Sequence, residues 1–327
     1  MNDMPTLGRP PKRVLRRSVI LLLMVVCVLL AVVGARRHHD AAVVPVPPVV
    51  ADASVPEVAA RPPSDELGRA GLRKVKVDLS GPLETALVQG LGSELGQRLT
   101  QTVVRQLAWW VQVPKDLLRG DRIELLFEER VGQEPLVVAL RFRSHKLGRE
   151  FKSFRFVAPG AQFGHYYQPG GSELELRLID SPLDDYDQVT SLLKDGRDHK
   201  GIDFKTPVGT PIRAPFEAVV VRKTWLFAQN GNSLELRDVA THRAAIFLHL
   251  SPLPASLFVG AAIKRGDVVA QTGNSGHSFA PHLHYQLVSP KGEALDPFVI
   301  HKTMRRKLSP TDLALFNAEM QRLEHLF

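Results

Sequence analysis

Two short runs of sequence carry most of the information in this chain. Residues 199–203 read His-Lys-Gly-Ile-Asp, and residues 281–285 read Pro-His-Leu-His-Tyr. Imidazole and carboxylate groups are the usual side chains that hold a catalytic zinc through three protein ligands and leave a fourth position open for water. In a β-strand, side chains at positions i and i+2 share one face, so His282 and His284 can both point into one groove. A zinc site needs only one of them, which leaves a second imidazole beside the metal for proton transfer.

The sequence around these runs predicts an antiparallel β-domain over residues 181–302. Glycine and proline punctuate short runs of β-branched and apolar residues, a pattern typical of such a domain. The predicted strands are 210–214, 217–223, 232–237, 244–248, 268–271 and 283–288. Turn sequences at 264–267 and 272–276 are expected to bring strand ends to a groove.

Residues 66–180 predict a separate small α+β domain. Apolar residues at spacings of three and four indicate one helical face, which we expect to end at Pro114; they are Leu95, Leu99, Val103, Leu107 and Trp110. Strands are predicted at 122–129, 136–142, 150–157 and 173–179, with a hairpin turn at 169–171. No catalytic constellation is found here. After the β-domain, residues 309–327 predict a helix that packs on the chain's own body, because Ser309-Pro310 is a good helix start. The expected fold class is therefore β-rich α+β.

The N-terminal part predicts export. Residues 1–17 are a basic tail, and residues 18–35 form an uncharged apolar run close to the roughly 17–25 residues that span a bilayer core. Basic residues before such a run stay in the cytoplasm, so the remainder is expected outside the inner membrane. A cleaved signal peptide is the alternative, and Arg36-Arg37 after the run favours an uncleaved anchor. Residues 36–65, rich in Pro, Ala and Val, are expected to form an extended linker.

Composition excludes some classes of function. The net charge of +8 is concentrated near the two ends of the chain, and the interleaved aromatic residues of a base-stacking surface are missing, so we expect no nucleic-acid partner. An anionic cell-wall polymer or a membrane surface suits this charge distribution better. Cys27 is the single cysteine, which excludes a disulfide framework within one chain.

Three blocks of this sequence resemble those of the lysostaphin-type (LytM-like) zinc metallopeptidases. The first is residues 199–214, beginning with His199. The second is Phe-Leu-His-Leu at 247–250, which resembles the Tyr-x-His-Leu block of that family. The third is Gly-Asn-Ser-Gly at 273–276 leading to 281–285. The blocks occur in the order of the family and cover most of residues 190–297, so the resemblance is specific.

The resemblance implies the role of each candidate site residue. It implies that His199, Asp203 and His284 bind Zn²⁺ and that His249 and His282 are catalytic without being ligands. Three ligands and an open position are the arrangement that catalytic zinc requires. The chain has no His-Glu-x-x-His motif, so a thermolysin-like site with a glutamate base is excluded.

Some positions differ from the family pattern. Phe247 replaces the Tyr expected two residues before His249, Glu217 stands where glycine is common, and the loop before His199 is short. These differences concern substrate contacts and the shape of the groove. The segment around 107–171 is also similar, more faintly, to the domain that precedes the peptidase in Gram-negative murein DD-endopeptidases.

The resemblance implies a zinc-dependent endopeptidase that cuts peptide cross-links in bacterial peptidoglycan, anchored in the inner membrane with its catalytic domain in the periplasm or cell envelope. The bond expected in a Gram-negative envelope joins D-alanine to meso-diaminopimelate. One alternative is a non-catalytic relative that binds peptidoglycan or activates an amidase, although such relatives commonly lose zinc ligands. Another is a zinc-stabilised structural module, which would require four closed ligands, typically including cysteine.

Overall fold

The structure is a computed structural model that describes residues 68, 71–195 and 198–327. The predicted basic tail, membrane anchor and linker at 1–17, 18–35 and 36–65 lie outside the described residues. Within the described ranges, no helix is both long and apolar enough to cross a membrane.

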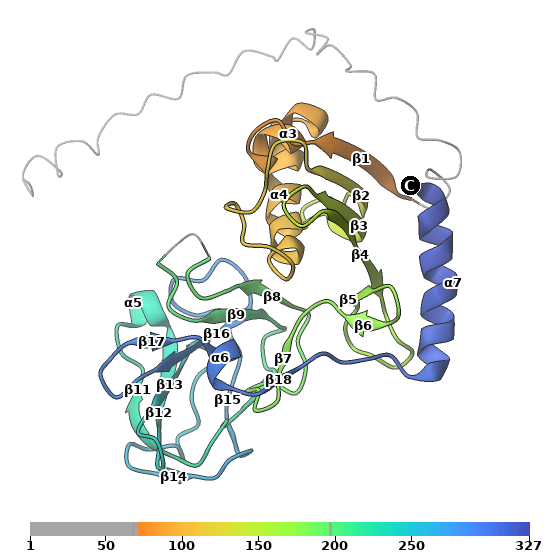
Figure 1. Cartoon of the computed structure of the whole chain (residues 1–327). Helices are drawn as coiled ribbons and strands as arrows, with labels where there is room; N and C mark the ends of the chain where they lie inside the picture. Colours follow the sequence, from red (N-terminus) through yellow and green to blue (C-terminus); the bar gives the residue numbers. More distant parts are fainter. Residues whose placement is uncertain (1–67, 69–70, 196–197) are drawn as a thin grey trace, which may run out of the picture. The chain divides into compact units, whose positions relative to one another are not determined.

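Residues 73–173 form a six-stranded antiparallel sheet with two helices. The strand order is β1-β2-β3-β4-β5-β6, so sequence neighbours are also neighbours in the sheet (Figure 1). The elements are β1 (Arg73–Asp78), α3 (Leu83–Leu91), α4 (Ser93–Leu107), β2 (Arg122–Glu128), β3 (Leu136–Ser144), β4 (Arg149–Phe156), β5 (His165–Gln168) and β6 (Ser172–Glu173). The α+β character and three of the predicted strands are confirmed here, and the turn at 169–171 joins β5 to β6.

Helix α4 buries the face that its periodicity predicts. Leu99, Val103 and Leu107 are fully buried against the inward residues of the sheet, such as Ile123 and Phe142. The helix ends at Leu107, so the prediction that it continues to Pro114 is wrong. After Leu107 the chain forms a series of turns in place of a regular helix. Backbone hydrogen bonds stabilise these turns.

The predicted strand at 173–179 is also wrong. The chain bends after Glu173 of β6, and the next strand is β7 (Arg177–Leu178), which pairs with β18 (Thr303–Met304) instead. The bend lets the Arg177 guanidinium donate to the Glu173 carboxylate at 3.0 Å, and both side chains are buried. An alternating pattern alone cannot reveal this buried ion pair.

Residues 188–295 contain an eight-stranded antiparallel sheet with the path β14-β11-β12-β13-β16-β9-β8, and β17 pairs with β16 (Figure 1). Strands β10 and β15 form a separate pair. The bounds are β8 (Gln188–Ser191), β9 (Ile202–Lys205), β10 (Pro211–Arg213), β11 (Ala218–Lys223), α5 (Phe227–Asn230), β12 (Asn232–Asp238), β13 (Ala244–Leu250), β14 (Ala262–Ile263), β15 (Val268–Gln271), β16 (His282–Val288), β17 (Ala294–Leu295) and α6 (Pro297–Ile300). The antiparallel β-rich domain is confirmed, with a core that includes Phe204, Phe247 and Tyr285.

The C-terminal helix α7 (Pro310–Leu326) begins at its predicted cap. The Ser309 side chain accepts a hydrogen bond from the Asp312 amide, and Pro310 occupies the first turn. Phe316 is 1% exposed and lies in one apolar cluster with Phe154 and Tyr167 of the first sheet. The expectation that this helix packs on the chain's own body is therefore confirmed.

Candidate metal centre

The site is built on the neighbouring antiparallel strands β9 and β16. In their register, Asp203 lies opposite His284, and Lys205 lies opposite His282. Directly opposite residues on one face of a sheet have their Cβ atoms about 4.5–5.5 Å apart. The Asp203 carboxylate and the His284 imidazole therefore meet across the strands, with 2.9 Å between Oδ1 and Nδ1.

His199 completes a group of three potential ligands from the loop before β9. Its Nε2 lies 3.1 Å from Nδ1 of His284 and 3.2 Å from Oδ1 of Asp203. Ligand atoms placed about 2.1 Å from a tetrahedral metal would be about 3.4 Å apart. The two imidazole nitrogens and the carboxylate oxygen therefore converge at close to the spacing of a three-ligand metal site.

Hydrogen bonds on the far side of the ring orient His199. Its Nδ1 lies 3.0 Å from the Leu192 carbonyl oxygen and 3.0 Å from Oγ of Ser191. A carbonyl only accepts, so Nδ1 carries the proton and Nε2 keeps its lone pair toward the group of ligands. Such outer hydrogen bonds fix the tautomer of a metal-binding histidine. Sequence reasoning did not identify Ser191 and Leu192 because nothing marks them before the loop is folded.

Two further histidines, His249 and His282, lie beside the three potential ligands. His249 lies at the end of β13, and its ring centroid is 4.8 Å from that of His282. Its Nδ1 donates to the Ser275 carbonyl at 3.0 Å, and Nδ1 of His282 donates to the Ala280 carbonyl at 2.8 Å. In the neutral form of each ring the proton is therefore on Nδ1, and Nε2 is the nitrogen that can accept another. Nε2 of His282 lies 3.9 Å from Oδ1 of Asp203.

The backbone at His249 is strained. Its φ of 62° lies in the left-handed region, which non-glycine residues seldom adopt. This residue sits between Leu248, which pairs with His284, and Leu250, which pairs with Asn232. Strained conformations of this kind cluster at functional sites, where the surrounding structure holds them.

Gly201 allows the His199 loop to approach β16. A Cβ atom on residue 201 would lie 2.5 Å from the Tyr285 carbonyl oxygen and 2.9 Å from Nε2 of His284. No side chain fits there without displacing the strand or the imidazole. The glycine in the His-Lys-Gly-Ile-Asp run is therefore required because a larger residue would clash with β16.

The pKa values of Asp203 and His199 are shifted by their neighbours. Burial by itself raises the pKa of Asp203, but its close contacts with the imidazoles of His199 and His284 outweigh it and hold the pKa well below its usual range. Burial lowers the pKa of His199, and the Asp203 carboxylate more than offsets this, so the net pKa is raised. An ionised carboxylate that attracts positive charge is the electrostatic environment that a cation requires.

His249 has the opposite shift. Burial lowers its pKa to about 4, although the hydrogen bond to Ser275 opposes the change. The ring is therefore neutral near pH 7 and can accept a proton at Nε2.

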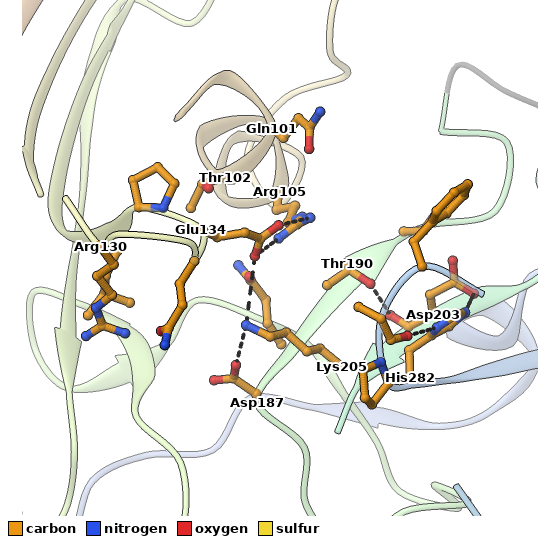
Figure 2. Close-up of a pocket in the computed structure, with 18 of the residues that line it drawn as sticks. Gln101, Thr102, Arg105, Arg130, Glu134, Asp187, Thr190, Asp203, Lys205 and His282 are labelled. Atoms are coloured by element: carbon orange, nitrogen blue, oxygen red, sulfur yellow. Dashed lines mark hydrogen bonds and ion pairs between the residues drawn. The ribbon is translucent and has the colours of Figure 1, made fainter. Parts of the chain in front are cut away.

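A cavity of about 750 Å³ opens beside the ligands (Figure 2). Asp203 and His282 line it at one end, and residues from α4 and from the loop between β2 and β3 line it at the other. Arg105 donates two hydrogen bonds to Glu134 at 2.9 and 3.0 Å. The side chain of Phe279, 91% exposed, also borders this cavity.

Three other residues of this domain, Phe247, Asp296 and His277, lie outside the group of ligands. Phe247 is fully buried and stacks on Tyr285 with 5.4 Å between ring centroids, so this difference from the family pattern alters the core and not the groove. Asp296 caps α6 by accepting from the Phe298 amide at 2.9 Å, and His277 is exposed.

The comparison with protein families bears directly on this region. Residues 197–297, which contain all five candidate residues, match Peptidase family M23. These residues form a peptidase family M23 domain. The resemblance stated from the sequence is therefore confirmed, and the M23 domain coincides with the strands that carry the candidate site.

The chain is also similar to curated proteins over a longer region. The peptidoglycan DD-endopeptidase ShyA of Vibrio cholerae is 26% identical over 244 residues, which are 71% of this chain and 54% of ShyA. Lysostaphin of Staphylococcus simulans is 33% identical over 88 residues, which are 27% of this chain and 17% of lysostaphin. The chain spans about half the length of ShyA and of the similar relatives ShyC and ShyB.

Among solved structures, Helicobacter pylori Csd3 matches at 20% identity with a TM-score of 0.36, covering 78% of this chain and 70% of that one. The family assignment therefore rests on the sequence match of the M23 domain.

Proposed function

We propose that this protein is a zinc-dependent endopeptidase that hydrolyses peptide cross-links in bacterial peptidoglycan. The observation that carries the proposal is the convergence of His199, Asp203 and His284, with their ligand atoms 2.9–3.2 Å apart, beside two histidines whose Nδ1 atoms contact backbone carbonyls. The M23 domain and the relatives named as peptidoglycan DD-endopeptidases support the same chemistry.

The donor set fits zinc. Two imidazole nitrogens and one carboxylate oxygen are ligands that catalytic zinc takes, and three ligands leave a position open. A zinc ion held there would supply Lewis acidity to the scissile carbonyl and to a water molecule in the open position. Zinc in this site is part of the proposal.

The remaining steps belong to His249 and His282. In each neutral ring, Nε2 can take a proton from the attacking water, and the same group can return it to the leaving amine. The bonds from Nδ1 to Ser275 and Ala280 stabilise the positive charge that the ring gains when it is protonated. Their N–H groups can then donate to the oxyanion that develops on the carbonyl.

The bond we propose joins D-alanine to meso-diaminopimelate, in line with relatives named DD-endopeptidases. An extended substrate suits the open cavity of about 750 Å³, which lies within the usual size range of ligand sites. We also propose that residues 18–35 anchor the protein in the inner membrane, with the M23 domain in the periplasm.

A non-catalytic relative that binds wall or activates an amidase is less consistent with the site, because His199, Asp203 and His284 are all present and lie close enough together to hold a metal ion. The test is digestion of purified peptidoglycan sacculi by the zinc-loaded protein, with released muropeptides analysed by mass spectrometry. Conversion of cross-linked dimers to monomers supports the proposal. Binding to sacculi without any cleavage would contradict it and favour the non-catalytic alternative.

A further inference from the structure

The cavity beside the ligands contains cationic side chains that differ in their partners. Four of them line it: Arg105, Arg130, Arg155 and Lys205. Arg105 forms a bidentate pair with Glu134, and Nζ of Lys205 lies 2.9 Å from the Asp187 carboxylate. These ion pairs are drawn in Figure 2. Their positive charges are therefore already balanced by carboxylates of the chain.

The two remaining arginines, Arg130 and Arg155, differ in whether they pair with a carboxylate. Nη2 of Arg130 donates to Glu128 at 2.8 Å. No hydrogen bond or ion pair joins the guanidinium of Arg155 to a carboxylate in the part of the chain that the structure describes. Arg155 is thus the cation of this cavity whose five N–H donors are not committed to an anion.

The fold holds Arg155 in a defined place. Arg155 lies on β4 opposite Tyr166 of β5, and its guanidinium lies against the bare Cα of Gly164. A Cβ atom on residue 164 would be only 2.5 Å from Cζ of Arg155 and 2.6 Å from both terminal nitrogens. Gly164 is itself buried, so the guanidinium packs on backbone where other residues would place a side chain.

We propose that Arg155 binds a free carboxylate of the peptidoglycan stem peptide while the scissile bond lies at His282 and the ligands. The inference rests on the proposed function. One cavity connects the two places, because Arg155, Asp203 and His282 all line it. A planar guanidinium recognises a carboxylate through two parallel hydrogen bonds, and a site that is partly removed from water strengthens that interaction.

Apart from the carboxylate at its C-terminus, the stem peptide offers two such groups, the free carboxyl of D-glutamate and that of meso-diaminopimelate. Both have the chemistry that Arg155 requires, and substitution of either carboxylate by an amide removes the negative charge at almost constant shape. The residues before 180 would then contribute directly to substrate selection by the M23 domain.

The experiment compares kcat/KM of the full zinc-loaded chain on three synthetic cross-linked dimers of stem peptides. One has both carboxyl groups free, one is amidated at D-glutamate and one at meso-diaminopimelate. We expect the wild type to prefer the free dimer over one of the amidated dimers by about 10- to 100-fold, the range for a charge-assisted hydrogen bond. Arg155→Gln should lose that preference, and Arg155→Lys should keep part of it.

The matched control is Arg143→Gln, since Arg143 is an exposed arginine of the neighbouring β3 that does not line the cavity. It should retain the wild-type preference. If Arg155→Gln slows all three dimers equally, its role is structural and the inference is wrong. It is also wrong if the wild type does not distinguish the dimers. A wild type that cleaves none of the dimers and no sacculi would instead contradict the proposed function.

Discussion

His284 and Asp203 are cross-strand partners in the sheet, and their side chains meet at 2.9 Å between Nδ1 and Oδ1. The same register places His282 opposite Lys205, one step along the same face. A shift of the β9–β16 pairing by one residue would turn Asp203 to the other face. The register of these two strands is thus what assembles the ligands.

Replacement of one ligand should release zinc. His284→Ala leaves only His199 and Asp203, and two ligands do not form the three-ligand site that catalytic zinc requires. We expect about one zinc per chain in the wild type and a large loss in the variant, measured by elemental analysis after gel filtration. His277→Ala, which removes an exposed histidine outside the ligands, should keep its zinc. Full zinc content in folded His284→Ala would rule out this ligand assignment.

Substitution of either of the other two histidines should slow catalysis without releasing zinc. His249→Ala and His282→Ala remove imidazoles that face the site without belonging to the group of ligands. We expect nearly unchanged zinc content and cleavage of sacculi slower by about 10²–10⁴-fold, as for loss of a general acid–base. Muropeptide release and zinc are measured on the same samples. Two variants that keep zinc and cleave at the wild-type rate would exclude the proton-transfer role.

A methyl group at position 201 should disturb the metal site. In Gly201→Ala the new Cβ would clash with the Tyr285 carbonyl and Nε2 of His284, so the imidazole must move. We expect a zinc affinity lower by about 10- to 100-fold, the range seen when the support of a ligand is lost. Competition with a chelator measures it. Gly81→Ala is the control, because a Cβ there meets no atom within 4 Å; equal affinities in the two variants would refute the steric argument.

The free energy of unfolding should decrease as pH rises, because the pKa of Glu175 is raised in the folded state. Burial raises the pKa of Glu175 to about 8 from its ordinary value of 4.5, and its carboxyl accepts the Val189 amide at 3.2 Å. Between these pH values the unfolded chain releases this proton and the folded chain keeps it. The contribution of Glu175 is therefore fully present below pH 4.5 and is lost as pH rises toward 8, at about 1.4 kcal/mol per pH unit.

Glu175→Gln cannot titrate and keeps an oxygen acceptor for Val189. Denaturant unfolding at pH 5 and pH 7.5 should show a free energy of unfolding that declines less in this variant than in the wild type. The exposed Glu84→Gln controls for the loss of one charge. Parallel pH dependence in the wild type and Glu175→Gln would mean that Glu175 titrates normally in the folded state.

The local features of this protein can be predicted from its amino-acid sequence. The spacing of apolar residues predicts the buried face of α4, and Ser309-Pro310 predicts the start of α7, because caps and periodicity act within a few residues. Alternation along a strand places His282 and His284 on one face. The types of side chain, two imidazoles and a carboxylate in the family order, predict a metal site with two further histidines.

The groups that support and surround the site are brought together by long-range packing of the folded chain. A buried ion pair accompanies the bend after Glu173. The tautomer of His199 depends on the Leu192 carbonyl in the loop just before it, and that of His249 on the Ser275 carbonyl of a more distant loop. Arg155 shares a cavity with His282 although a long stretch of chain separates them. Backbone carbonyls carry no sequence signature, and contacts between distant segments follow from strand register and packing, which local pattern does not specify.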